Sequence, residues 1–162
     1  LGEVSLTPTV VRSGDPAQMN VIPADATTWV DVRTIPGVDH GDLVATVAQL
    51  AEAAGATAGV ATQVTVVDDR PAVSTSAASP VVRALCEAHA AVTGRPARLG
   101  GVPGATDGTI LTARAGVPSV VYGPGGKWIA HQVDEFVEVA AVIEAAEVYR
   151  EAALRFFSGA LH

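Results

Sequence analysis

The sequence has 162 residues, enough for one ordinary domain or two small ones, and a formal net charge of −7 at pH 7. Hydrophobic residues make up 49 % and charged residues 17 % of it, which excludes a disordered chain; the acidic balance argues against a nucleic acid or an anionic membrane as partner. No apolar run reaches the roughly 18 residues of a membrane span, and no segment is typical of a signal peptide. Because Cys86 is the only cysteine, we expect no disulfide within the chain and a reducing, cytoplasmic location.

The N-terminal part predicts strand, strand, helix and strand in that order. Residues 3–11 favour an edge strand because they contain a proline, and residues 26–34 alternate as a second strand does. Asp39 can cap a helix that ends at Gly55, and residues 60–67 are typical of a further strand. The apolar stripe of this helix is Leu43, Val47, Leu50 and Ala54. This order is most of a β-α-β-β-α-β sandwich that lacks its first strand and helix.

The C-terminal part predicts an α/β alternation. Ser79 followed by Pro80 begins a helix, and a glycine-rich loop at residues 100–108 leads into a second, short helix. Residues 117–122 form an apolar segment of the kind found in parallel sheets, and a long helix follows over residues 136–157. Its residues predicted to face the core are Val139, Ile143, Ala146 and Ala153. Loops after the carboxyl ends of such strands are where ligands bind.

His131 lies in the loop between the predicted strand and the long helix. A neutral imidazole in such a loop can coordinate a metal ion, with nearby carboxylates orienting it. A surface or hydrogen-bonded structural histidine remains the alternative. The other histidines are weaker candidates: His40 is at a helix start, His89 is within a helix and His162 is the last residue.

The glycine-rich loop contains Gly104, Ala105 and Thr106. Glycines let main-chain N–H groups approach an anion, and the start of the next helix adds a positive dipole. The loop is not a nucleotide P-loop because no Gly-Lys-Ser/Thr follows it. The alternative is a tight loop with a Thr or Asp helix cap.

Asn20 and Arg33 are the third candidate. Asn20 can donate to a substrate oxygen, and the guanidinium of Arg33 can hold a carboxylate in fork geometry. Asp31 shares a strand face with Arg33, so a structural pair between these two side chains remains the alternative.

Four motifs occur in order along the chain: Asn-Val-Ile-Pro at 20–23, Asp-Val-Arg at 31–33 with Pro-Gly at 36–37, Gly-Ala-Thr-Asp at 104–107, and Gly-Pro-Gly at 123–125 with Ala-His-Gln-Val-Asp-Glu at 130–135. Together they resemble the di-zinc metallopeptidase and amidohydrolase family of succinyl-diaminopimelate desuccinylase, acetylornithine deacetylase, aminoacylase and carboxypeptidase G. The resemblance covers nearly the whole chain.

The resemblance implies a fold of two parts. Residues 1–70 would be the second half of a ferredoxin-like α+β lid and dimerisation domain, and residues 71–162 the C-terminal part of a zinc-peptidase-like α/β catalytic domain. It also implies two zinc ions in the complete enzyme, with cobalt or manganese as alternatives, and a homodimer formed through the lid.

The resemblance further implies roles for single residues. His131 would be a metal ligand, and Glu135 would support it or cap the following helix. The residues implied to contact substrate are Asn20, Arg33, Gly104, Ala105 and Thr106. Ala105 stands where some relatives have a hydroxyl residue, so a side-chain contact there is not implied.

Several parts of the family's active site do not occur in this sequence: the His-x-Asp motif, the bridging aspartate, the Glu-Glu pair with the general base and the lid histidine. We therefore expect a zinc-dependent hydrolase that cleaves the amide bond of an N-acyl amino acid or small peptide. This chain would supply only part of the site, contain no catalytic residue and be inactive without the missing N-terminal part. The alternatives are a non-catalytic dimerisation or peptide-binding relative, and a nucleotide-binding α/β domain that uses the glycine-rich loops.

Overall fold

The computed structural model describes residues 2–126, 129 and 132–159. The chain divides into two compact units, Leu1–Ala72 and Val73–His162, which are described separately. No helix within the described residues is both long and apolar enough to cross a membrane.

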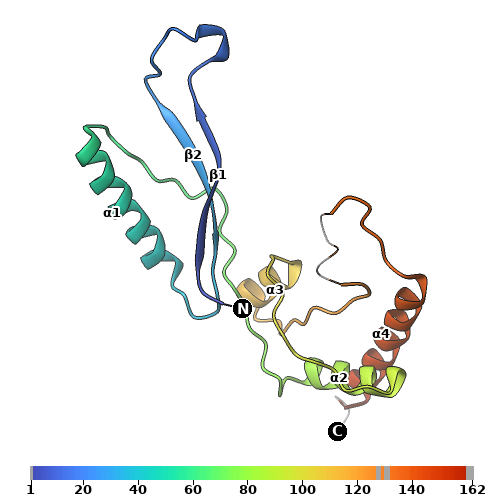
Figure 1. The fold of residues 1–162 in the computed structure, drawn as a ribbon. Helices are drawn as coiled ribbons and strands as arrows, with labels where there is room; N and C mark the ends of the chain where they lie inside the picture. The colour runs from blue at the N-terminus through green and yellow to red at the C-terminus, as the bar shows by residue number, and fades with distance from the viewer. Residues whose placement is uncertain (1, 127–128, 130–131, 160–162) are drawn as a thin grey trace. The chain divides into compact units, whose positions relative to one another are not determined.

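The first unit consists of a β-hairpin and a helix (Figure 1). Strand β1 (Ser5–Ser13) pairs antiparallel with β2 (Ala26–Arg33), with Ser5 opposite Arg33 and Ser13 opposite Ala26. A short 3-10 helix, Pro16–Gln18, lies in the connection. The pairing shifts register just after Pro8, where the chain has no N–H group to donate. Both strands were predicted, and the predicted edge position of the first is confirmed.

Helix α1 (His40–Ala58) begins where the sequence predicts and ends later. The Asp39 carboxylate accepts a hydrogen bond from the Asp42 amide at 2.9 Å, so the predicted cap is confirmed. The predicted end at Gly55 is wrong, because the helix is closed by Gly59 in a left-handed conformation, with φ of 69°. Gly55 is buried, and a Cβ atom on it would lie 2.7 Å from both the Val60 carbonyl oxygen and Thr62 Cγ2. Glycine at this position therefore permits the close return of the chain after the helix.

We expect Gly55→Ala to destabilise the first unit, although alanine favours helix by about 1 kcal/mol over glycine. The added methyl group would meet main-chain atoms that cannot move aside, and such overpacking typically costs about 1–3 kcal/mol. Chemical unfolding followed by far-UV circular dichroism measures the change. Ala54→Gly, at an exposed position of α1, is the matched control. Its free energy of unfolding should fall only by the difference in helix propensity between alanine and glycine. A Gly55→Ala variant more stable than the parent chain would contradict this reading of Gly55.

Two further predictions for this unit are wrong. Residues 60–67 are extended but pair with no strand in the described part of the chain, because a strand forms only where another strand supplies its hydrogen-bond partners. The predicted stripe of α1 is correct only in part, since Leu43 and Val47 are half-buried whereas Leu50 is 67 % exposed.

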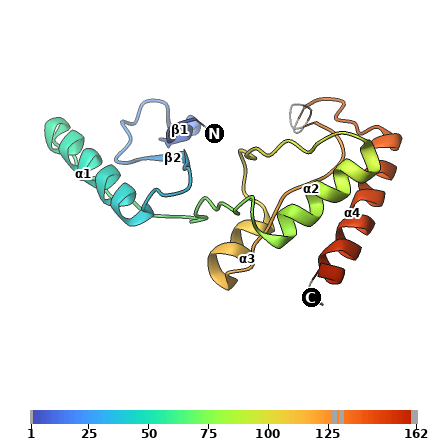
Figure 2. The same ribbon diagram turned by 90° about the horizontal axis from the view of Figure 1, so that it is seen from below.

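The second unit is built on two helices that pack together, α2 (Pro80–Thr93) and α4 (Val139–Gly159) (Figure 2). Ser79 precedes α2 and Pro80 is its first residue, as predicted, and Gly94 ends it in a left-handed conformation with φ of 70°. The short helix α3 (Asp107–Ala115) follows the glycine-rich loop. The buried apolar residues in the described part of this unit are Val82, Ala84 and Ala88 on α2 and Ala145 and Val148 on α4.

Helix α4 buries a different face from the predicted one. Ala145 and Val148 are buried, whereas Val139 is 73 % exposed and Ile143 57 % exposed. Ala146 and Ala153 are also exposed. The helix is apolar on more than one side, so hydrophobic periodicity alone cannot select the face that α2 covers.

Residues 117–122 were predicted as a strand, and this is wrong for the described chain, which contains only the β1–β2 sheet. The segment is extended and held by side chains. Thr112 Oγ1 donates to the Val117 carbonyl at 2.9 Å, and Thr75 Oγ1 donates to the Ser119 carbonyl at 2.5 Å. These bonds fix the segment beside α3 and the chain that precedes α2.

Candidate functional site

Arg33 is the last residue of β2 and forms an ion pair with Asp31. Arg33 Nε lies 2.6 Å from Asp31 Oδ2, and the two side chains are 59 % and 45 % exposed. The pair forms because residues two apart on a strand point to the same face. An exposed pair of this kind contributes little to stability. The contact uses Nε, and a guanidinium has two further nitrogens that can hold a carboxylate.

Asn20 lies in an exposed turn after the 3-10 helix, in the connection between the two strands. Arg33 lies at the other end of the hairpin, opposite Ser5, whereas the connection begins at Ser13. The seven residue steps from Ala26 to Arg33 span about 23 Å at the usual rise of a strand. Within one copy of the chain, the hairpin therefore does not bring Asn20 and Arg33 to the same small group.

Gly104, Ala105 and Thr106 lie directly before α3. Thr106 is the N-cap residue of α3, and its amide donates to Thr109 Oγ1 at 3.4 Å. Gly104 closes a tight turn by donating its amide to the Val102 carbonyl at 2.9 Å. The loop thus has the helix-capping geometry that the sequence left open as an alternative. Gly104 and Ala105 are exposed and accessible to a ligand.

Gly108, the second residue of α3, explains why the loop lies close to residues 117–122. A Cβ atom on Gly108 would lie 3.1 Å from Ser119 Cβ. Any larger residue would push the start of α3 away from this segment.

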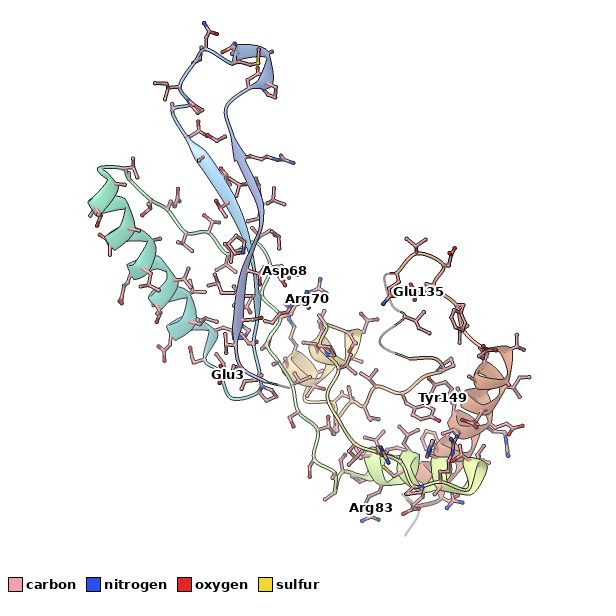
Figure 3. All side chains as sticks on the ribbon, viewed as in Figure 1. Glu3, Asp68, Arg70, Arg83, Glu135 and Tyr149 are labelled. Atoms are coloured by element: carbon pink, nitrogen blue, oxygen red, sulfur yellow. The ribbon has the colours of Figure 1, made fainter. Side chains whose placement is uncertain are left out.

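His131, the predicted metal ligand, lies outside the described residues. Glu135 is described and lies exposed in the loop before α4 (Figure 3). Glu135 lies four residues before Val139, where α4 begins, and its role as a support for His131 or a cap of this helix stays a prediction. Within the residues that the structure describes, no group of three or more His, Cys, Asp or Glu side chains could hold a metal ion. The described residues therefore do not form the predicted zinc site by themselves.

Two histidines that seemed weak candidates have defined partners. His40 Nε2 lies 3.0 Å from Thr34 Oγ1, and His40 Nδ1 lies 2.5 Å from Asp69 Oδ1, which joins the start of α1 to the end of the first unit. His89 Nδ1 lies 3.1 Å from the Tyr122 hydroxyl. Sequence reasoning missed both contacts because the paired residues are 29 and 33 positions apart.

The fold of the chain is similar to that of a solved structure, the M20 family metallo-carboxypeptidase Sso-CP2 from Sulfolobus solfataricus. The TM-score is 0.71, the sequences are 18 % identical, and the match covers 94 % of this chain and 36 % of that one. At this identity the likeness concerns the fold, which is thus a mixed α/β fold of the metallo-carboxypeptidase type.

The family itself follows from the sequence. The model of peptidase family M20/M25/M40 matches residues 7–155, and the chain belongs to this family. Its members are metal-dependent hydrolases. The predicted resemblance is confirmed at the level of the family, whereas the desuccinylase, deacetylase and carboxypeptidase branches stay predictions.

The chain is also 32 % identical over 93 residues to a Pyrococcus furiosus protein assigned by inference as a LysW-lysine/LysW-ornithine hydrolase. The match covers 57 % of this chain and 28 % of the relative. The chain therefore spans about a third of the length of the proteins it matches.

Proposed function

We propose that this chain supplies the C-terminal part of a metal-dependent hydrolase that cleaves the amide bond of an N-acyl amino acid or a small peptide. The observation that carries the proposal is the family match over residues 7–155, which includes all four motifs of the candidate site. The relative from Pyrococcus furiosus supports the substrate class, because its assigned activity is that of a LysW-lysine/LysW-ornithine hydrolase.

In this proposal the chain's own residues bind and orient substrate. Arg33 holds a carboxylate through its terminal nitrogens while Asp31 fixes Nε. The exposed Gly104–Ala105 peptide and the first turn of α3, which follows Thr106, offer N–H groups to a substrate oxygen. Asn20 contacts a separate group, because it lies at the far end of the hairpin.

The metal site is proposed to form with residues beyond this sequence. His131 would be one ligand, and a stable site needs three or four. Zinc, cobalt and manganese are the divalent ions proposed. The hydrolytic step is assigned to the remainder of the protein, because the family motifs implied to carry it do not occur in this sequence.

The first unit is proposed to pack against the missing N-terminal part and a second copy of the protein. Several of its large apolar side chains are open to solvent, among them Leu6 at 50 %, Val11 at 68 % and Val67 at 82 %. These exposed side chains support the proposal, because contiguous apolar patches on a protein surface mark interaction sites.

Metal removal from the complete protein tests the function. We expect a chelator to abolish hydrolysis of a panel of acetyl, succinyl and peptide amides, and added Zn²⁺, Co²⁺ or Mn²⁺ to restore it. The 162-residue chain alone is the control and should show no hydrolysis with any metal. Hydrolysis that persists after chelation would contradict the proposal. A metal-loaded complete protein that binds these peptides without cleaving any of them would instead support the non-catalytic alternative.

A further inference from the structure

Three aromatic side chains from three segments of the second unit meet where residues 117–122 end. His89 comes from α2, Tyr149 from α4, and Tyr122 lies between them. The ring of Tyr122 stands edge-on to His89, with centroids 5.9 Å apart, and edge-on to Tyr149, with centroids 5.6 Å apart. Edge-on rings at this spacing attract each other, so the cluster links both helices to the end of the segment.

The hydroxyl groups of the two tyrosines make different contacts. The Tyr122 hydroxyl is bonded to His89 Nδ1 at 3.1 Å, which fixes the Tyr122 side chain. The Tyr149 hydroxyl donates to the main-chain carbonyl of Tyr122 at 2.5 Å. Only the second contact holds the main chain, and it does so at the last peptide before Gly123 (Figure 3 shows Tyr149 on α4).

The main chain after Tyr122 needs such an anchor. Residues 123–126 read Gly-Pro-Gly-Gly, and glycine has the widest conformational freedom of any residue. The Tyr149 hydroxyl also lies 3.6 Å from the position of a Cβ atom on Gly123. Gly125 takes a left-handed conformation, with φ of 84°, and a Cβ atom there would lie 3.6 Å from Val137 Cγ2. A side chain at the first or third residue of the loop would therefore touch Tyr149 or Val137.

The surroundings of Tyr122 favour the protonated form of its hydroxyl group. Burial, and then the nearby carboxylate of Glu144, raise the pKa of the Tyr122 hydroxyl above its ordinary value of 10.0. The Arg95 guanidinium lowers the pKa of Tyr122. Its Nη2 atom lies 3.7 Å from Glu144 Oε2.

We propose that Tyr149 is a positioning residue: its hydroxyl fixes the Tyr122 carbonyl and so holds the glycine loop of residues 123–126, which leads in sequence to His131. The role in catalysis rests on the proposed function, whereas the role in holding the loop does not. The proposal is therefore tested in two arms that can fail separately.

The first arm uses the 162-residue chain and compares Tyr149→Phe with Tyr122→Phe. Each variant loses one hydroxyl and keeps its ring, but only Tyr149→Phe releases the main-chain carbonyl. We expect the ¹⁵N order parameters of Gly123 and Gly125 to fall from near 0.85 to below about 0.6 in Tyr149→Phe and to stay unchanged in Tyr122→Phe. Unchanged amide resonances of Ala88 and Val148 would show that the helix pair is intact.

An equal fall of the order parameters in both variants would overturn the proposal. So would glycine order parameters already below about 0.6 in the unsubstituted chain, a measurement that does not depend on either variant folding.

The second arm uses the complete protein and measures kcat, KM and bound metal. We expect Tyr149→Phe to lower kcat or metal affinity about 10–100-fold, with KM and the thermal midpoint close to those of Tyr122→Phe. If the two variants have equal kcat and metal affinity, the catalytic part of the proposal is wrong. A complete protein without any hydrolase activity would overturn the proposed function and leave the result of the first arm standing.

Discussion

Replacing His131 by alanine in the complete protein is expected to lower the rate of amide hydrolysis by at least about 100-fold. Loss of a residue that merely supports a metal ligand already costs 10–100-fold in affinity or activity, and loss of a ligand itself should cost more. The bound metal, measured by atomic absorption after dialysis, should fall together with the rate. High metal concentration should restore part of the activity, because the remaining ligands still form an incomplete site.

His162→Ala is the matched control for this experiment, since it removes another imidazole from the same chain at its last residue. It should leave both metal content and rate unchanged. Full activity and full metal content in the His131→Ala protein would remove the chemical basis of the proposed function. Loss of activity with an unchanged content of bound metal would instead indicate that His131 contacts the substrate.

Replacing Val148 by aspartate is expected to unfold the second unit. Val148 is 0 % exposed and lies in the small core between α2 and α4. An unpaired carboxylate buried there costs several kcal/mol, which is comparable with the total of about 5–15 kcal/mol that stabilises a typical domain. The helical circular dichroism signal should fall, and the amide resonances of residues 80–93 should collapse to unfolded positions.

Ile143→Asp is the control for this variant, because it places the same residue on the same helix at a side chain that is 57 % exposed. The costs of the two substitutions in helix propensity differ by only a few tenths of a kcal/mol, so burial dominates the difference between the variants. We expect Ile143→Asp to change the stability of the chain by less than about 1 kcal/mol. Equal destabilisation by the two substitutions would mean that the α2–α4 contact is not the core of this unit.

Local signals in the sequence predicted the helices well. Asp39, the Ser79-Pro80 pair and Gly94 act through the main chain of their own or adjacent turns, so their effects can be inferred without a fold. The same holds for Pro8, which limits strand pairing wherever the strand lies. Gly55 was misread as a helix end, since its role depends on the return of Val60 and Thr62.

The candidate site could be predicted only in part. The motifs identified the family, and the pairing of Arg33 with Asp31 follows from their spacing along one strand. The separation of Asn20 from Arg33 required the hairpin register, and the contact of Tyr149 with Tyr122 required the packing of α4.

By itself, the sequence determined the membership of the M20 family, both strands of the hairpin and the starts of α1 and α2, because these depend on residue identity and on contacts within a few positions. Only the tertiary structure decided which face of α4 is buried, why position 55 is glycine and how the peptide before Gly123 is held. An apolar helix such as α4 offers several equivalent faces, and a hydrogen bond such as that from Tyr149 to Tyr122 joins residues 27 positions apart. These features depend on packing between segments that are far apart in the sequence. No local sequence pattern therefore predicts them.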